Sequence, residues 1–173
     1  NNSMSMAWTG NWLTKEIDGL FGLATSKNWS DFSRAAQKFG VPGQNIVYAD
    51  DQGNIGWRPA VFIPIRKEGS SLIPRPGDDP RYDWGGRVPY KNMPFLLNPK
   101  KGFIATANNK TIDDSFPYYI SGLWADPSRA QQIMARLDTM KNTTVDEMKS
   151  IQLDYTSLFA KEITPHLLSI KTG

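Results

Sequence analysis

Hydrophobic and polar positions in the first forty residues alternate with the period of α-helices. Residues 12–24 and the stretch from Asp31 to Phe39 each carry an apolar stripe, and Ser30 is the expected N-cap of the second stretch. Gly19 and Gly22 are expected to weaken the first helix, because glycine is a poor helix former. The inner face of the second helix is predicted to consist of Phe32, Ala35, Ala36 and Phe39.

The next stretch has the pattern of a β-hairpin. Asn45–Asp50 alternates around β-forming residues, Asp51–Asn54 contains a turn glycine, and Ile55–Arg58 returns as a second strand. Pro59 and Pro64 predict that the second strand is an edge strand or is interrupted, because proline cannot donate to a sheet ladder.

Glycine, proline and aromatic residues are interleaved between Arg66 and Pro99. We expect an ordered, irregular crossing that packs on a sheet, since flexible linkers lack such aromatic content. The aromatic residues could instead form a stacking platform for nucleic acid. The net charge of +3 is small and the basic residues are scattered, so we predict no nucleic-acid partner.

Length and composition are those of a folded chain. The 173 residues fit a single domain or a fragment of one, and 39% are hydrophobic. No apolar run approaches the ~18 residues needed to cross a bilayer, so no membrane partner is predicted. The absence of cysteine excludes a disulfide framework and a thiolate metal site. The stretch Ser3–Thr9 has a strand pattern with no preceding partner, which suggests a piece of a longer protein.

A short apolar strand, Gly102–Ala107, is predicted to end at two carboxamides, Asn108 and Asn109. A side-chain amide at the end of a rigid element can direct an N–H group at a developing oxyanion, which makes this a candidate site. The alternative is an ordinary turn, because asparagine tolerates left-handed backbone and bonds locally. The residues themselves leave both interpretations open.

A helix is predicted to begin at Asp126-Pro127, with Arg129 in its first turn. The helix dipole disfavours a cation at that end. We therefore expect Arg129 to meet a carboxylate or a specific carbonyl; the alternative is a solvated side chain. Thr144–Glu147 has the pattern of a capping box before a further helix. Later apolar positions predicted to face inward are Met148, Ile151, Leu158 and Phe159.

Several segments, taken in order and with their spacings, resemble the penicillin acylase family of N-terminal nucleophile hydrolases. The resemblance covers about Met4 to Phe159, nearly the whole chain, and the ordered set is more specific than any one segment. The segments are Ala7-Trp8-Thr9-Gly10, Asn28-Trp29-x-x-Phe32, Gln44-Asn45-x-Val47-Tyr48-Ala49-Asp50, Gly53-Asn54-Ile55-Gly56, Pro64-x-Arg66, Pro74-x-Pro76-Gly77, Asp83-Trp84-x-Gly86, Asn98-Pro99-x-x-Gly102-x-Ile104-x-Thr106-Ala107-Asn108-Asn109 and Trp124-Ala125-Asp126-Pro127-x-Arg129.

The resemblance implies an α+β fold, here a portion of the αββα sandwich of those hydrolases. It also implies hydrolysis of a linear amide by a serine that begins the second chain of a self-cleaving precursor and uses its own α-amine as base. Asn108 matches the family asparagine whose side-chain N–H helps form the oxyanion hole. Arg129 matches the family arginine that lies near the serine amine and orders the site. Family substrates include penicillins, glutaryl cephalosporins and acyl-homoserine lactones.

The resemblance places the nucleophilic serine well over a hundred residues before position 1, so Asn1, Ser3 and Ser5 do not match it. The expected partners are the remainder of the catalytic chain, the alpha chain of the same precursor and a small-molecule amide substrate. The family's acidic calcium ligand near 121–123 has no counterpart, since Leu123 precedes Trp124. No cofactor is therefore predicted for this chain, although calcium is possible in the parent protein.

By the same resemblance the parent protein is expected to be periplasmic or extracellular, and this chain alone is expected to be inactive. A second hypothesis is a non-catalytic binding or structural domain on the acylase scaffold. Aromatic loops such as Phe116–Tyr119 would serve that function.

Overall fold

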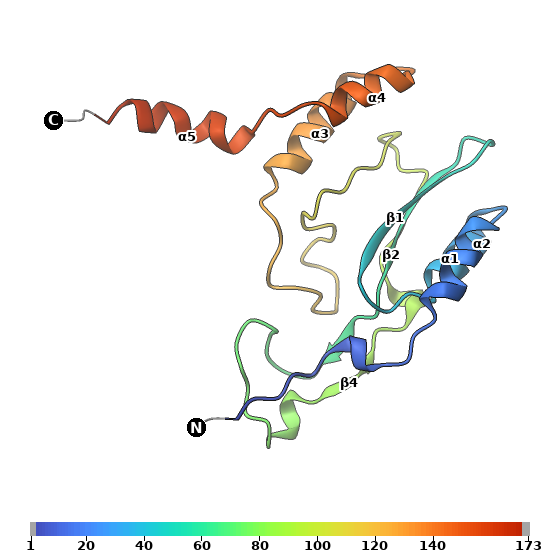
Figure 1. Cartoon of the computed structure of the whole chain (residues 1–173), viewed down its shortest axis with the longest axis vertical. Coiled ribbons are helices and arrows are strands. Elements are labelled where there is room, and N and C mark those ends of the chain that lie inside the picture. The colour runs from blue at the N-terminus through green and yellow to red at the C-terminus, as the bar shows by residue number, and fades with distance from the viewer. Residues whose placement is uncertain (1–2, 171–173) are drawn as a thin grey trace. The chain divides into compact units, whose positions relative to one another are not determined.

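The computed structural model describes residues 3–170, which form two compact units (Figure 1). The first comprises residues 3–104 and Ile112–Leu123, and the second comprises Ala105–Thr111 and residues 124–170. The α-helices are α1 (Glu16–Ala24), α2 (Trp29–Ala36), α3 (Ser128–Thr139), α4 (Val145–Gln152) and α5 (Leu158–Leu168). Short 3-10 turns are η1 (Thr9–Asn11), η2 (Pro80–Tyr82) and η3 (Tyr90–Asn92). Among the described residues, no helix has the length and apolarity to span a membrane.

Two antiparallel sheets lie in the first unit. One has the order β1-β2-β5, formed by β1 (Gln44–Ala49), β2 (Ile55–Ala60) and β5 (Leu96–Leu97). The other pairs β3 (Pro64–Arg66) with β4 (Trp84–Arg87). The predicted hairpin is confirmed, and the interruption implied by the prolines separates β2 from β3.

The hairpin turn is organised by Asp50. Its carboxylate accepts hydrogen bonds from the backbone N–H groups of Gln52 and Asn54 at 3.1 and 2.8 Å, and from the Tyr48 hydroxyl at 2.7 Å. The side-chain amide of Asn54 also donates to Asp50, at 2.9 Å. This bond first, and the others after it, hold the pKa of Asp50 below its usual range. The carboxylate of Asp50 is thus occupied by its own turn.

Helix α2 contacts the β1–β2 hairpin, beside which α1 and α2 are drawn in Figure 1. The predicted inner face is confirmed, because Phe32, Ala35, Ala36 and Phe39 are all buried. The N-cap is Asn28 rather than Ser30: Asn28 Oδ1 accepts from the Asp31 N–H at 2.9 Å. The predicted cap was wrong because an amide oxygen two residues earlier accepts from a free N–H group of the first turn.

The glycines of α1 have a packing role that the sequence analysis did not predict. A Cβ added at Gly19 would lie 2.5 Å from the Phe39 ring, and one at Gly22 would lie 2.9 Å from the Ala35 Cβ. Glycine therefore permits the close packing of α1 on α2. Other apolar side chains of α1 remain exposed, with Ile17 at 66% and Phe21 at 70%, whereas Leu23 packs against the core.

Two predicted strands, Ser3–Thr9 and Gly102–Ala107, are not strands in the structure. Residues 3–8 form no regular element before η1, and 102–107 form an irregular segment. Both predictions rested on local pattern, whereas a strand requires a hydrogen-bonded partner, and neither segment has one among the described residues. The prediction that Met148 and Phe159 face inward was also wrong, because their side chains are 46% and 57% exposed.

Glu16 ties the start of α1 to the segment that follows α2. Its Oε1 accepts from the N–H groups of Gly40 and Val41 at 2.9 and 3.1 Å, and its Oε2 accepts from the Thr14 hydroxyl at 2.5 Å. Burial raises the pKa of Glu16, but these hydrogen bonds outweigh burial and lower the pKa to about 2.

Because this pKa is lowered on folding, ionised Glu16 should stabilise the protein fully above about pH 4.5 and lose that contribution as the pH falls towards about 2. Glu16→Gln should therefore lower the melting temperature at neutral pH, and the gap from the wild type should close through this pH window. Thermal unfolding followed by circular dichroism across the window measures both. Glu162→Gln, at an exposed position of α5, is the matched control. A difference in melting temperature that does not change with pH contradicts the lowered pKa of Glu16.

Candidate active site

The candidate site lies in the second unit, where the loop Ala105–Thr111 meets the start of α3. Arg129, in the first turn of α3, donates from Nη2 to the Ala107 carbonyl and to Asn108 Oδ1, each at 2.8 Å. The Asn108 carbonyl accepts from the Ala125 N–H at 3.1 Å. The expectation that Arg129 meets a specific carbonyl is thus confirmed, although both Arg129 and Asn108 are exposed to solvent.

Arg129 determines which way the Asn108 amide points. A guanidinium has only donors, so the atom that faces it must be the carbonyl oxygen Oδ1. The Nδ2 group is then directed away from Arg129, and it has no hydrogen-bond partner among residues 3–170. The site therefore presents a fixed, unused N–H donor to solvent.

Asn109 has a different role from its neighbour. Its Oδ1 accepts from the Ala107 N–H at 3.0 Å, and its Nδ2 donates to the Lys110 carbonyl at 2.9 Å. Asn108 adopts left-handed backbone with φ of 61°, which asparagine tolerates better than most residues. The two interpretations left open by the sequence therefore coexist: Asn109 builds the turn, and Asn108 displays its amide.

The N-cap of α3, Pro127, makes no side-chain bond, and Asp126, one residue earlier, acts as the local cap. Asp126 Oδ1 accepts from the Ser128 N–H at 2.9 Å, which, with the Ser128 hydroxyl, holds the pKa of Asp126 below its usual range. The helix begins at Ser128, one residue after Pro127, which agrees with the predicted start within the usual uncertainty of helix ends. This cap sets the position from which Arg129 reaches the loop.

Arg129 also lines a cavity of about 490 Å³ in the second unit. The cavity lies between α3, α4 and the segment that leads into α5, and its lining includes Ile133, Ile151 and Tyr155. The Asn108 amide is thus exposed, and it bonds to a residue that lines this cavity. An arginine at the rim of a mostly apolar cavity is the kind of convergence found in ligand sites.

One side of the cavity is held by a polar network that the sequence analysis missed. Asp154 Oδ2 accepts from Gln132 Nε2 at 2.8 Å and from Arg136 Nη1 at 3.0 Å. Hydrogen bonds from Thr156, Gln132 and Arg136 lower the pKa of Asp154 well below its ordinary range. The spacing of Gln132 and Arg136 by four residues on α3 was the available signal, because such residues share one helix face.

Clustered acidic side chains are common ligands of calcium. Among residues 3–170, no three Asp, Glu or His side chains gather closely enough to hold a metal ion. Leu123, which stands where the resemblance calls for an acidic ligand, is exposed and offers no side-chain oxygen.

Comparisons with known proteins identify the fold and the family. A solved structure of a thermostable penicillin G acylase from Alcaligenes faecalis matches with a TM-score of 0.69 and 25% identity, over 91% of this chain and 30% of that chain. Acyl-homoserine lactone acylase QuiP from Pseudomonas aeruginosa is 34% identical over 149 residues, which are 86% of this chain and 18% of QuiP. Penicillin G acylase from Escherichia coli is 32% identical over 83% of this chain and 17% of its own length.

These findings define the chain as an α+β portion of an N-terminal nucleophile hydrolase fold, of the type found in acylases. The penicillin amidase family model matches residues 1–173, and the chain belongs to the penicillin amidase family. It spans less than a fifth of the length of these two curated relatives, at 18% and 17%.

The bonds from Arg129 should control the local order of the candidate site. Arg129→Ala removes both bonds that hold the Ala107–Asn108 segment, so the Ala125 N–H, which bonds to Asn108, should exchange with deuterium about tenfold faster or more. Hydrogen exchange of the protein, read for peptides covering 105–126, measures this effect. Arg34→Ala, an exposed arginine of α2, should leave these peptides unchanged. Equal exchange in Arg129→Ala and the wild type contradicts the role of Arg129.

Proposed function

We propose that this chain is a supporting portion of the catalytic chain of an amide hydrolase, with the attacking serine outside the chain. The observation that carries the proposal is the exposed amide of Asn108, fixed by Arg129 with its Nδ2 group unused. The acylase names of the relatives support hydrolysis of an acyl amide. Candidate substrates are the penicillin-type and acyl-homoserine lactone amides named by those relatives.

Asn108 acts in this proposal as one donor of the oxyanion hole. When the serine adds to the carbonyl, negative charge develops on the carbonyl oxygen, and an N–H group already in place stabilises that charge without reorganising. The bond from cationic Arg129 to Oδ1 polarises the amide and strengthens Nδ2–H as a donor. The second donor of the hole and the serine come from the rest of the parent protein.

Arg129 acts as a positioning residue and as a fixed positive charge. It holds the loop at two points and so sets the direction of the Asn108 amide. A cation near the α-amine of the serine favours the neutral amine, and a neutral amine can accept the serine proton. Both effects depend on the guanidinium staying at the carbonyl of Ala107.

The remaining expectations about the parent protein follow from the same proposal. The rest of the catalytic chain and the alpha chain cover apolar surface such as Phe21 and Leu123, which are 70% and 78% exposed. Calcium, if the parent protein binds it, is held by residues outside this chain. The parent protein is exported to the periplasm or beyond.

Removing the Asn108 amide from the full-length parent enzyme should lower kcat about a hundredfold or more, since one oxyanion donor is worth ~2.7–4 kcal/mol. Asn108→Gly removes the side chain and tolerates the left-handed backbone, whereas Asn108→Asp keeps the shape and loses the donor. Steady-state hydrolysis of a chromogenic acyl amide measures kcat and KM for both.

The matched control is Asn142→Gly. Asn142 is an exposed asparagine of the same unit with the same kind of backbone, with φ of 53°. It should retain full activity. Normal turnover in both Asn108 variants would remove Asn108 from the catalytic site.

The second hypothesis is a non-catalytic domain that uses the acylase scaffold for binding or structure, and the contacts of the aromatic loop bear on its binding part. Tyr118 packs against the core residues Ile63, Val88 and Met93, and the Tyr119 hydroxyl bonds to Ser71 at 3.1 Å. The aromatic loop is therefore structural.

The gene provides a direct test between the two hypotheses. Upstream of Asn1 it should encode a self-cleavage junction followed by Ser-Asn and an apolar strand, and the 173 residues alone should not hydrolyse an acyl amide. Absence of the junction, or turnover by the isolated chain, contradicts the placement of the nucleophile.

A further inference from the structure

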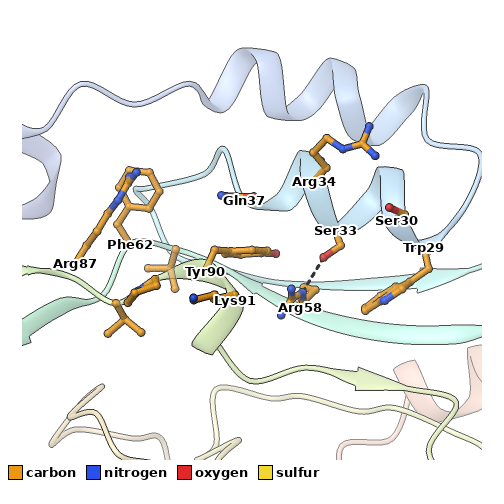
Figure 2. Close-up of a pocket in the computed structure, with 13 residues that line it drawn as sticks. Trp29, Ser30, Ser33, Arg34, Gln37, Arg58, Phe62, Arg87, Tyr90 and Lys91 are labelled. Atoms are coloured by element: carbon orange, nitrogen blue, oxygen red, sulfur yellow. Dashed lines mark hydrogen bonds between the residues drawn. The ribbon is translucent and has the colours of Figure 1, made fainter.

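A second cavity, in the first unit, is strongly basic. It has a volume of about 720 Å³ and is lined by α2, the end of β2 and the segment 87–91 (Figure 2). Four cationic residues line it, namely Arg34, Arg58, Arg87 and Lys91, and no aspartate or glutamate is among the lining residues. No part of the proposed catalytic site belongs to this cavity.

Arg58 is the buried centre of this cavity, with only 9% of its surface exposed. Its Nε donates to Ser33 Oγ at 2.9 Å, as Figure 2 shows, and its Nη1 donates to the Met93 carbonyl at 3.3 Å. The guanidinium lies 4.3 Å from the centre of the Tyr90 ring and 5.0 Å from that of Phe95. The contacts orient the guanidinium but supply no negative charge.

Within residues 3–170, Arg58 forms no ion pair, and Nη2 has no hydrogen-bond partner. Burial lowers the pKa of Arg58, yet arginine remains protonated in proteins. A buried cation without a counter-ion is strongly unfavourable. The described residues thus leave a charge that an anion would neutralise.

Tyr90 adds a second unused group. Its Oη is buried and makes no hydrogen bond of normal geometry with the described residues. Burial raises the pKa of Tyr90, and the opposing effects of Arg58 and of the nearby Ser33 hydroxyl are smaller. Tyr90 therefore remains a neutral O–H donor on the same wall as Arg58 (Figure 2).

The other three cations of the cavity differ in how far their charge is neutralised or covered. Arg34 is partly neutralised by Asp31 at 3.4 Å, and Arg87 stacks over Phe62 at 4.2 Å. Lys91 is exposed beside Tyr90. The potential in the cavity is therefore positive, with Lys91 and Arg87 available to attract an anion.

We propose that this cavity binds a small organic carboxylate, with Arg58 and Tyr90 as its anion-binding groups. The unpaired Nη2 group of Arg58 and the Tyr90 hydroxyl can each donate to an oxygen of a carboxylate, and the aromatic walls at Trp29 and Phe62 suit an apolar body. The volume lies in the range of ligand pockets, ~300–1,000 Å³. One aspartate or glutamate side chain from a neighbouring chain would fill only a small part of it.

The test is a thermal-shift titration of the full-length parent protein with 3-phenylpropionate. The wild type should be stabilised in a saturable way, because a ligand that binds the native state raises its stability by mass action. The neutral analogue 3-phenylpropan-1-ol should give no comparable shift, and neither should sulfate. Isothermal titration then gives the affinity of each variant.

Arg58→Gln should weaken 3-phenylpropionate binding at least about tenfold, the range for loss of a charged hydrogen bond. If Arg58→Gln does not fold, Lys91→Gln at the exposed rim should still weaken binding about threefold, and more at low salt. Lys161→Gln, an exposed lysine of α5, should bind as the wild type does. Asn108→Asp should also leave this affinity unchanged.

Three outcomes overturn the proposal. A flat titration of the wild type means that Arg58 is already neutralised within the parent protein. Binding that persists in Arg58→Gln and is lost in Asn108→Asp places the carboxylate in the catalytic site. An equal response to sulfate means that the cavity only attracts anions in general.

Discussion

The geometry of the candidate site depends on one cation reaching two oxygens. Arg129 occupies the first turn of α3, where the helix dipole costs a cation about 0.3–1 kcal/mol. Each of its bonds to Ala107 and Asn108, at this solvent-exposed position, is worth about 0.5–1.5 kcal/mol. The two bonds outweigh the cost of the dipole, so Arg129 stays at a helix position that is unfavourable for a cation. The bonds of Arg129 consequently fix the loop Ala105–Thr111, the start of α3 and the Asn108 amide relative to one another.

Arg129 and Arg58 show two ways in which a protein can treat an arginine. Arg129 is exposed and satisfied by neutral oxygens, so its charge is moderated by solvent and its role is to orient a neighbour. Arg58 is buried between aromatic rings, bonded to a hydroxyl and a carbonyl, and left without an anion. Only 9% of its surface is exposed, so solvent screens that charge less than it screens the charge of Arg129. The first arrangement suits a scaffold for catalysis, and the second suits a receptor for negative charge.

Local sequence patterns predicted much of the fold. The predictions that failed depended on contacts between residues far apart in the sequence. The hairpin, the buried face of α2 and the capping box at Thr144 depend on neighbouring residues, and all three are present. The strands at Ser3–Thr9 and Gly102–Ala107 failed because pairing is a long-range property. Single-sequence reading also missed the function of Gly19 as a contact between helices.

The candidate site shows the same division. Asparagine at positions 108 and 109 was recognisable as a turn or a site, but the direction of the Asn108 amide is set by Arg129, twenty-one residues further on. No local pattern encodes that bond; only the resemblance joined the two residues. Because the bond lies within one compact unit, the direction of the donor is a property of this chain. In the function proposed above, completion of the oxyanion hole is instead a property of the parent protein, since the hole needs a second donor and a nucleophile from outside this chain.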